Sequence, residues 1–468
     1  MSVIRFGTDG WRARMGRDFS FRNVRIFARA YGRLMRRRHP GRDLKIIVNF
    51  DTRFLSSQFA QETARLFSLM GIETMLPNRD APLPAVALAV VQKNCLGAVN
   101  FTASFNKPIF NGIKVFNQAG APAMPSETAL IEDEIDRIAP HFTFKPRYAN
   151  NALIGSVDVR TPYISYIEEV IDFSKIRSAG MSIVVDNLFG ASRDYLDYLL
   201  SHNGIEIHSI HNFPYASFGG VVPSCDRDNL RDLAQTVRDR GADIGLATDI
   251  DGDRFGIVDT QGRFICANKI MPPLIEYLIS VRKMDGGIVK SISTTDTINR
   301  VADYYLRKVH VTPVGFKYLA DMMRRRRSFI GVESTNGASL NRTITIKDGI
   351  LFNLLVLEML AHHKLDLTRL FDHFYQKFPP LYNHEASMPK TSERASKLEE
   401  LVQGRGDGPS GYPVRDVVKI DGVKYLFDDG WLLLRESGTH DVIRLYSEAS
   451  TRKKAREMVR LGRMLLGQ

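Results

Sequence analysis

Three aspartates at alternate positions in one short segment could together hold a cation. Asp249, Asp251 and Asp253 follow the apolar run 242–248, which has the composition of a buried strand. In an extended chain, alternate side chains lie on one face, where three carboxylates repel one another unless a cation lies among them. Hard oxygen ligands that leave coordination positions open suit Mg²⁺ completed by phosphate and water. We therefore predict a magnesium site, with a solvated acidic turn as the alternative.

A calcium-binding EF-hand loop is the competing explanation for this spacing. That loop requires glycine directly after the third acidic residue and glutamate at its twelfth position. Arg254 and Thr260 occupy these two places. The sequence therefore excludes an EF-hand.

A second polar loop contains a serine that could act as a nucleophile. Ser104 follows the strand-like run 96–101, and Lys114 lies ten residues further on. A serine in a polar turn is usually only a turn former or a helix cap. The chain has no Gly-x-Ser-x-Gly elbow for acyl chemistry and no Walker-type phosphate loop. The loop alone therefore leaves the chemistry of Ser104 open.

Strands and helices that alternate along the chain must position these two loops. Strand-like runs at 44–50, 181–190, 242–250 and 286–293 are each followed or preceded by segments with helical spacing. Repeated strand-helix-strand units predict largely parallel sheets with helices on both faces. From about residue 384 the pattern changes to a helix and antiparallel strands, with Asp-Gly pairs as hairpin turns. We predict three α/β domains and a smaller α+β domain.

Composition restricts the partners and the cellular compartment. The chain of 468 residues carries a net charge of +12, which favours anionic partners without choosing among them. The densest arginine runs, 36–38 and 324–327, follow helical segments and have no interleaved aromatic residues, so no nucleic-acid partner is expected. No run of 18 apolar residues and no signal peptide are seen, and the three cysteines are widely separated. We expect a cytoplasmic protein with no membrane partner.

The two polar loops resemble motifs of one enzyme family. Residues 102–114 are similar to the phosphoserine loop of the α-D-phosphohexomutases, and 249–254 resemble that family's metal loop. Further similar segments follow in the family's order, at residues 6–12, 185–190, 312–317, 347–350 and 434–446. Each is weak alone, but together they cover essentially the whole chain and are highly specific.

The resemblance implies a fold of four domains around a central cleft. Three would be α/β domains with mixed sheets flanked by helices, and the last a smaller α+β domain. The expected domains are 1–150 with the phosphoserine loop, 151–257 with the metal loop, 258–370 with the sugar-specificity loop and 371–468 with the phosphate-binding loop.

The resemblance also implies a role for each matched residue. Ser104 would be phosphorylated and would be a Mg²⁺ ligand together with Asp249, Asp251 and Asp253. Lys114, Arg12 and Arg254 would join Ser104 as catalytic residues, with Lys114 as the general acid or base. The residues expected to grip the non-reacting phosphate are Arg435, Ser437, Gly438, Thr439 and Arg444. The residues expected to contact the sugar are Thr312, Gly315, Phe316, Lys317, Glu333 and Ser334.

Four departures from the family's usual motifs concern the same loops. Phe105 stands where histidine is usual, and Lys107 where proline is usual. Val332 occupies the expected glutamate position, with Glu333 one place later, so either the loop shifts register or the hexose is recognised differently. His440-Asp441 replaces Glu-Pro. The phosphoryl-handling residues are therefore intact, whereas the sugar-handling residues are altered.

These features predict a phosphohexomutase that interconverts hexose 1-phosphate and hexose 6-phosphate. Glucose phosphate is the first expected substrate and mannose phosphate the second, with hexose 1,6-bisphosphate as intermediate and activator. The partners would be small-molecule sugar phosphates, and the protein a monomer or homodimer. A non-catalytic or altered-specificity sugar-phosphate-binding paralogue is the main alternative, and a bisphosphate phosphatase is another.

Overall fold

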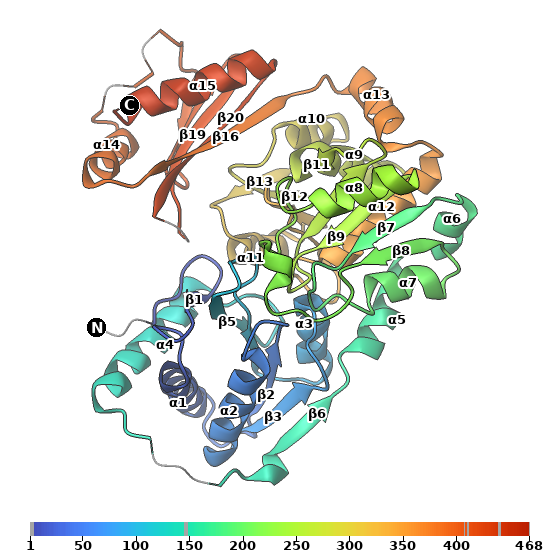
Figure 1. The fold of residues 1–468 in the computed structure, drawn as a ribbon. Coiled ribbons are helices and arrows are strands. Elements are labelled where there is room, and N and C mark those ends of the chain that lie inside the picture. Colours follow the sequence, from blue (N-terminus) through green and yellow to red (C-terminus); the bar gives the residue numbers. More distant parts are fainter. Residues whose placement is uncertain (1–3, 145–147, 407, 410, 439–440, 468) are drawn as a thin grey trace. The chain divides into compact units, whose positions relative to one another are not determined.

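The computed structural model describes residues 4–144, 148–406, 408–409, 411–438 and 441–467 (Figure 1). The chain divides into two compact units, each discontinuous in sequence. Unit 1 comprises Met1–Cys266 and Thr335–Leu370, and unit 2 comprises Ala267–Ser334 and Phe371–Gln468. The predicted domain boundaries at residues 150, 257 and 370 stay predictions.

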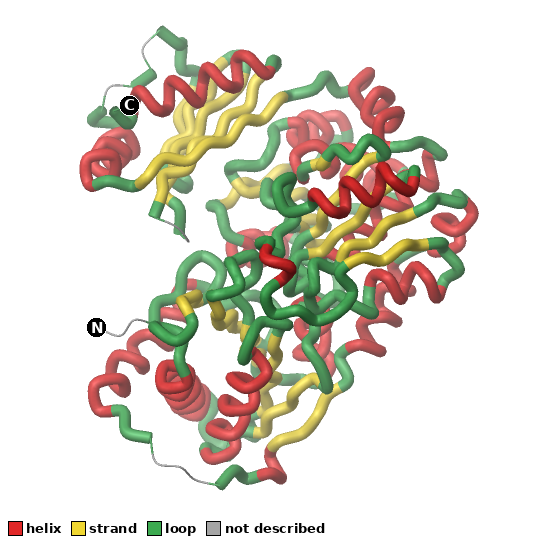
Figure 2. Tube along the Cα trace, viewed as in Figure 1, coloured by secondary structure: helices red, strands yellow, loops and turns green. Residues whose placement is uncertain are grey.

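The first sheet of unit 1 has six strands in the order β1-β5-β4-β2-β3-β6. Its strands are β1 (Trp11–Arg14), β2 (Lys45–Phe50), β3 (Glu73–Pro77), β4 (Gly97–Phe101), β5 (Phe110–Asn117) and β6 (Ile154–Val157). The β1-β5 and β5-β4 pairs are antiparallel, and the remaining pairs are parallel. The associated helices are α1 (Phe21–Arg38), α2 (Ser56–Leu69), α3 (Leu83–Gln92) and α4 (Pro125–Ile138). The sheet is therefore mixed, and helices pack around it (Figure 2).

The second sheet of unit 1 carries the predicted metal loop, in the order β11-β10-β9-β7-β8. Its strands are β7 (Ile183–Asp186), β8 (Ile207–Ile210), β9 (Ile244–Thr248), β10 (Phe255–Asp259) and β11 (Phe264–Ile265). The helices of this region are α5 (Arg160–Val170), α6 (Phe173–Ser178), α7 (Leu196–His202), α8 (Arg231–Arg240) and α12 (Gly349–His363). Helix α12 packs against β9 and β10 and is buried on nearly every side, as its apolar sequence predicts.

Unit 2 contains a parallel sheet and an antiparallel sheet. The parallel strands, in the order β13-β12-β14, are β12 (Ile288–Ser291), β13 (Val309–Thr312) and β14 (Ile330–Val332). Helices of this region are α9 (Ala267–Ser280), α10 (Thr297–Tyr304) and α11 (Phe316–Arg326), while α13 (Leu367–Lys377) continues the chain out of unit 1. Strand β15 (Ala338–Leu340) belongs to unit 1.

The antiparallel sheet of unit 2 confirms the change of pattern predicted for the end of the chain. Its order is β16-β20-β19-β18-β17, with every pair antiparallel. The strands are β16 (Tyr382–Pro389), β17 (Asp416–Val418), β18 (Val423–Phe427), β19 (Gly430–Glu436) and β20 (Val442–Ala449). The sequence interpretation missed helix α15 (Arg452–Leu465), which packs on β16, β19 and β20, whereas α14 (Ser392–Gln403) lies where a helix was predicted. Sheets flanked by helices throughout confirm the predicted α/β class.

The arginine runs lie where the helix-end interpretation places them. Arg36–Arg38 form the last turn of α1 and are exposed, and Arg324–Arg326 do the same in α11. Cations there interact favourably with the negative end of the helix dipole. Within the described residues, no helix is both long enough and apolar enough to cross a bilayer.

Candidate active site

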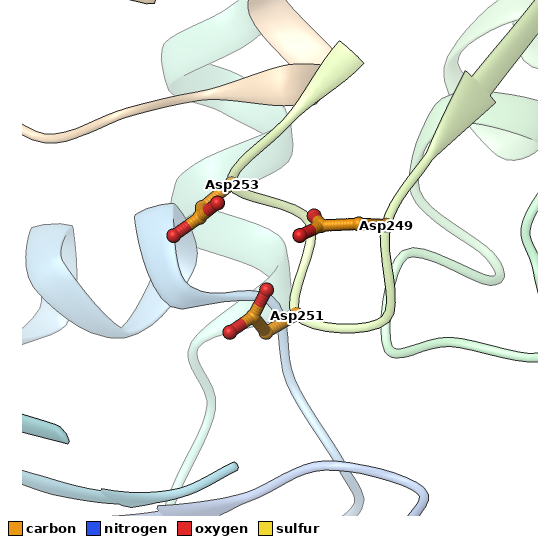
Figure 3. Close-up of side chains that lie close together, drawn as sticks. All are labelled: Asp249, Asp251 and Asp253. Atoms are coloured by element: carbon orange, nitrogen blue, oxygen red, sulfur yellow. The ribbon is translucent and has the colours of Figure 1, made fainter. Parts of the chain in front are cut away.

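The three aspartates converge in unit 1, in the loop between β9 and β10 (Figure 3). Each offers a carboxylate oxygen within 4.8 Å of the others, and all three side chains are buried. The expected extended conformation is wrong, because the Gly252 amide donates to the Asp249 carbonyl at 3.0 Å and closes a tight turn. The three carboxylates lie close together because this turn brings them to one point. They therefore share a site as predicted, although the chain is not extended there.

The turn depends on two glycines. Gly252 has a φ of 70°, a left-handed conformation that side chains disfavour. At Gly349, the first residue of α12, an added Cβ would lie 2.2 Å from the Arg254 carbonyl oxygen. The Gly349 amide also donates to the Gly252 carbonyl at 3.0 Å. The start of α12 therefore braces the metal loop from a segment about 95 residues later in the chain.

Ser104 lies against this carboxylate cluster. Its Oγ donates towards Asp249 Oδ2 at 3.2 Å and Asp251 Oδ1 at 3.3 Å, and the residue is fully buried. The backbone φ of Ser104 is 46°, which is strained for a residue other than glycine. Thr102 stabilises this conformation, because its Oγ1 accepts from the Ser104 amide at 2.9 Å and donates to Asp251 Oδ2 at 3.1 Å.

Arg53 ties down the serine loop from the end of β2. Its Nη1 donates to the carbonyl oxygens of Lys107 at 3.0 Å and Phe110 at 2.9 Å. Its Nη2 donates to the Asn106 carbonyl at 2.6 Å and to that of Ser104. The guanidinium is buried and pairs with Asp51 at 3.3 Å. One arginine thus donates hydrogen bonds to four carbonyl groups of the serine loop and holds that loop in a single conformation.

Two lysines neutralise the carboxylates. Lys114 Nζ lies 2.9 Å from Asp251, 3.1 Å from Asp253 and 2.9 Å from Asp9. Lys347 Nζ lies 2.9 Å from Asp253 Oδ2. Burial alone would lower the pKa of Lys114, but the three carboxylates outweigh it and raise that pKa. Both ammonium groups are therefore held in their charged form, since the pKa of Lys347 is raised in the same way.

The carboxylates respond unequally to this environment. Burial, reinforced by Asp251 and Asp253, raises the pKa of Asp249 well above its usual value. Burial also opposes ionisation of Asp9 and Asp253, but Lys114 and Lys347 overcome it and lower both pKa values. At Asp249, Arg254 and Lys114 act against the rise in pKa but do not offset it, so a metal ion at the site would add the missing positive charge beside Asp249.

The cluster fits Mg²⁺. All protein donors are oxygens, three carboxylates with the Ser104 hydroxyl beside them. Asp253 Oδ1 is buried and has no hydrogen-bond partner among the described residues. A hard cation would satisfy that oxygen and the charge of Asp249 together. The sequence prediction that the aspartates could hold a metal is thus supported by their geometry.

Arg12 and Arg254 approach the same cluster. Arg12, on β1, donates from Nη2 to Asp9 Oδ2 and from Nη1 to Asn106 Oδ1, both at 3.0 Å. Its Nε is buried without a hydrogen-bond partner in the described part of the chain. The Arg254 amide donates to Asp249 Oδ1 at 3.0 Å, and its Nε lies 3.8 Å from Asp253 Oδ1. Arg12 therefore retains a donor that a phosphoryl oxygen could accept.

The expected phosphate-gripping arginines form a cross-strand pair in unit 2. Arg435 on β19 lies directly opposite Arg444 on β20. Like charges in this position destabilise a sheet unless an anion shares them. Ser437 donates its amide to the Val442 carbonyl at 2.9 Å, and Gly438 follows it in the exposed loop. Thr439, also expected here, lies outside the described residues, as does His440.

One carboxylate joins the expected phosphate loop to the expected sugar loop. Asp421 Oδ2 accepts from Arg435 Nε at 2.8 Å and from the Val314 amide at 2.9 Å. Val314 belongs to the segment that leads into α11.

The remaining sugar-contact residues also lie in unit 2. Thr312 ends β13, Gly315 precedes α11 with a φ of 131°, and Phe316 and Lys317 are buried in the first turn. Glu333 and Ser334 directly follow β14, and Ser334 Oγ lies 2.9 Å from Ser293 Oγ. Their contact with a sugar stays a prediction. Val332 is fully buried within β14, so it cannot take the place of the family's usual glutamate.

Four successive segments of the chain match the four domains of the phosphoglucomutase/phosphomannomutase family. The matches are alpha/beta/alpha domain I at residues 3–141, domain II at 161–262, domain III at 267–378 and the C-terminal domain at 390–460. The chain belongs to the phosphoglucomutase/phosphomannomutase family. It is therefore a phosphotransferase of the mutase type with that family's four-domain fold, as the sequence motifs predicted.

Relatives in this family span nearly the whole chain. A Thermococcus kodakarensis phosphoglucomutase/phosphomannomutase is 28% identical over 465 residues, 98% of each chain. A Komagataeibacter xylinus phosphoglucomutase is 27% identical and covers 95% of this chain and 87% of its own. A second T. kodakarensis protein, named "Probable phosphoglucosamine mutase", is 30% identical over 81% of each chain. The solved structure of a Burkholderia thailandensis family member, 21% identical, covers 99% of this chain and 98% of its own with a TM-score of 0.84, which supports the fold.

Three residues that contact the carboxylate cluster or the serine loop carried no role in the sequence interpretation. Asp9 and Lys347 were matched only as parts of the family-like segments 6–12 and 347–350, and Arg53 gave no signal. Each contacts the cluster or the serine loop through a partner distant in sequence. For Lys347 the motif match at 347–350 was the one usable signal.

Proposed function

We propose that this mutase interconverts hexose 1-phosphates and hexose 6-phosphates through a phosphoserine at Ser104 and a hexose 1,6-bisphosphate. Glucose phosphate is the preferred substrate and mannose phosphate the second. The observation that carries the proposal is the Ser104 hydroxyl buried against Asp249 and Asp251, with Lys114 paired to Asp251 and Lys347 paired to Asp253. The relatives named phosphoglucomutase and phosphomannomutase support the choice of sugars.

The metal expected at the aspartates is Mg²⁺. Asp249, Asp251 and Asp253 would hold it together with an oxygen of phosphorylated Ser104. When bound there, it would neutralise charge on the transferring phosphoryl group. A solved Aspergillus fumigatus N-acetylphosphoglucosamine mutase was obtained with GlcNAc-6P and magnesium.

The chain's own residues would position the phosphoryl group and move the protons. In the first transfer, the bond between phosphorus and Ser104 Oγ breaks while phosphorus bonds to the free sugar hydroxyl. Lys114, held protonated by its carboxylates, gives a proton to Ser104 Oγ and receives the one leaving the sugar. Arg12 offers its Nε to the transferring group. The bisphosphate then reverses, and its other phosphate returns to Ser104.

An altered-specificity or non-catalytic sugar-phosphate-binding paralogue is the second candidate. The buried Val332 at the end of β14 favours it, because the first acidic residue after the strand is Glu333, one place later than the family's usual glutamate. Small-molecule sugar phosphates would be the partners in either case. We also propose a cytoplasmic monomer or homodimer with no nucleic-acid partner.

A coupled assay tests the proposal. Glucose 1-phosphate or mannose 1-phosphate is supplied with Mg²⁺ and a trace of glucose 1,6-bisphosphate, and hexose 6-phosphate formation is followed. We expect turnover in the wild type, its loss in Ser104→Ala, and wild-type rates in Ser178→Ala, which alters an exposed serine at the end of α6. Phosphorylation of Ser104 without turnover of either sugar would favour the second candidate. Phosphate release from the bisphosphate would indicate a phosphatase.

A further inference from the structure

The ring of Phe105 contacts two arginines, Arg12 and Arg254, that lie beside the carboxylate cluster. The guanidinium carbon of Arg254 lies 4.3 Å from the ring centroid, and that of Arg12 lies 4.9 Å from it. Both distances are within the range of a cation–π interaction, which strengthens where water is excluded. The side chains of Arg12 and Arg254 are only 9% and 15% exposed. Phe105 directly follows Ser104, so the ring and the nucleophile share one loop.

Two guanidinium groups that lie close together repel each other, and each also has a carboxylate neighbour. Arg12 is held by Asp9 and by Asn106 Oδ1, the side chain that follows Phe105. Arg254 has Asp253 Oδ1 at the longer distance of 3.8 Å from its Nε. The electron-rich face of the ring offsets part of the repulsion and limits where each cation can lie.

We propose that Phe105 is a positioning residue that holds Arg12 and Arg254 beside the phosphoryl group on Ser104. This inference rests on the proposed mutase function. A phenyl ring cannot exchange a proton, so the residue after the nucleophile acts here through the placement of charge. Lys114 is the residue that transfers the proton in the proposed mechanism.

Progressive fluorination of Phe105 tests the inference, because fluorine withdraws electron density from the ring face while nearly preserving its shape. Full-length protein would carry mono-, di- or trifluorophenylalanine at position 105, and the rate of Ser104 phosphorylation by glucose 1,6-bisphosphate would be measured by intact mass. We expect the rate to fall stepwise, by about 10-fold at the trifluoro stage. As a control, the same fluorinated phenylalanines replace Phe173, a buried residue of α6. There they should leave the rate of Ser104 phosphorylation unchanged.

Conventional variants give a second measurement. Phe105→Tyr should retain the rate within about twofold, whereas Phe105→Leu, which fills similar space without a π face, should lose about 10-fold. Rates independent of fluorination, or equal in the Tyr and Leu variants, would overturn the role of Phe105 while leaving an active wild type and its function intact. A wild type that takes no phosphoryl group from the bisphosphate would overturn both.

Discussion

At the residue scale, the carboxylate cluster of unit 1 shows unequal charge compensation. Lys114 and Lys347 satisfy Asp9 and Asp253, whereas the pKa of Asp249 is raised because burial and its neighbouring aspartates act on it together. The remaining repulsion is what a divalent cation would remove. Binding of a metal ion should therefore be visible in stability as well as in rate.

Magnesium should raise the melting temperature of the wild type, because a ligand that binds only the folded state stabilises it. In Asp251→Asn, which keeps the shape but removes one charged ligand, we expect most of this shift to be lost. Thermal unfolding with Mg²⁺ or with EDTA provides the measurement. Asp303→Asn, at an exposed position in α10, is the control that should behave like wild type. If Mg²⁺ left the melting temperature of the wild type unchanged, that result would contradict the assignment of the aspartates as metal ligands.

At the scale of elements, the serine loop depends on one side chain from another strand. Arg53 is expected to hold the loop that contains Ser104 through four carbonyl groups. In Arg53→Met the apolar stem remains but the donors are lost, so residues 102–110 should exchange their amide hydrogens faster. The phosphorylation rate of Ser104 should fall by about 10-fold or more.

Hydrogen exchange followed by mass spectrometry would compare Arg53→Met with Arg177→Met, which alters an exposed arginine of α6. Unchanged protection across 102–110 in Arg53→Met would mean that the loop holds its conformation without this arginine. An increase spread over the whole of unit 1 would instead indicate general destabilisation.

The start of α12 should make stability depend on pH. Asp348 caps this helix by accepting from the Leu351 amide at 2.9 Å, and it accepts from the Tyr163 hydroxyl at 2.7 Å. Burial raises the pKa of Asp348 to about 6. A raised folded-state pKa gives stability that is complete below the ordinary pKa of about 4 and is lost as pH rises through about 6.

Asp348→Asn keeps an oxygen acceptor for the cap but cannot ionise. Its melting temperature should therefore fall less than that of wild type between about pH 4.5 and about pH 7.5. The measurement is a series of thermal unfolding curves across this range. Parallel pH profiles for the two proteins would show that Asp348 does not set the slope.

The sequence predicted what local patterns determine. Strands such as β9 and helices such as α12 lie where their apolar runs placed them. Long-range contacts were not predictable, because Arg53 has no local feature that distinguishes it from a surface cation, and the motif match at Lys347 did not reveal its partners. The turn at 249–253 was misjudged as extended, since the left-handed Gly252 that closes it depends on bracing from α12.

At the scale of the whole molecule, the excess of positive charge should act on anionic substrates before they bind. A net charge of +12 raises the local concentration of sugar phosphates, and salt screens the effect. We expect kcat/KM for glucose 1-phosphate to fall several-fold between about 20 mM and about 300 mM NaCl, with kcat changing less.

A variant in which the exposed Arg324, Arg326 and Arg327 are replaced by Gln should show a shallower salt dependence. The comparison uses initial rates at low substrate concentration across the salt series. If the salt dependence had the same slope in both proteins, it would arise instead at the residues that we propose bind the phosphate, such as Arg435 and Arg444.

The discontinuity of unit 1 has a consequence for synthesis on the ribosome. Asp253 is translated about 95 residues before Lys347, and the intervening chain belongs mostly to unit 2. At ordinary elongation rates, about 5–20 s pass between the synthesis of the acidic loop and that of Lys347 and the start of α12, which brace this loop. During that interval the loop lacks Lys347 and the start of α12, so a nascent chain stalled before residue 347 should be far more susceptible to protease at this loop than the released full-length chain.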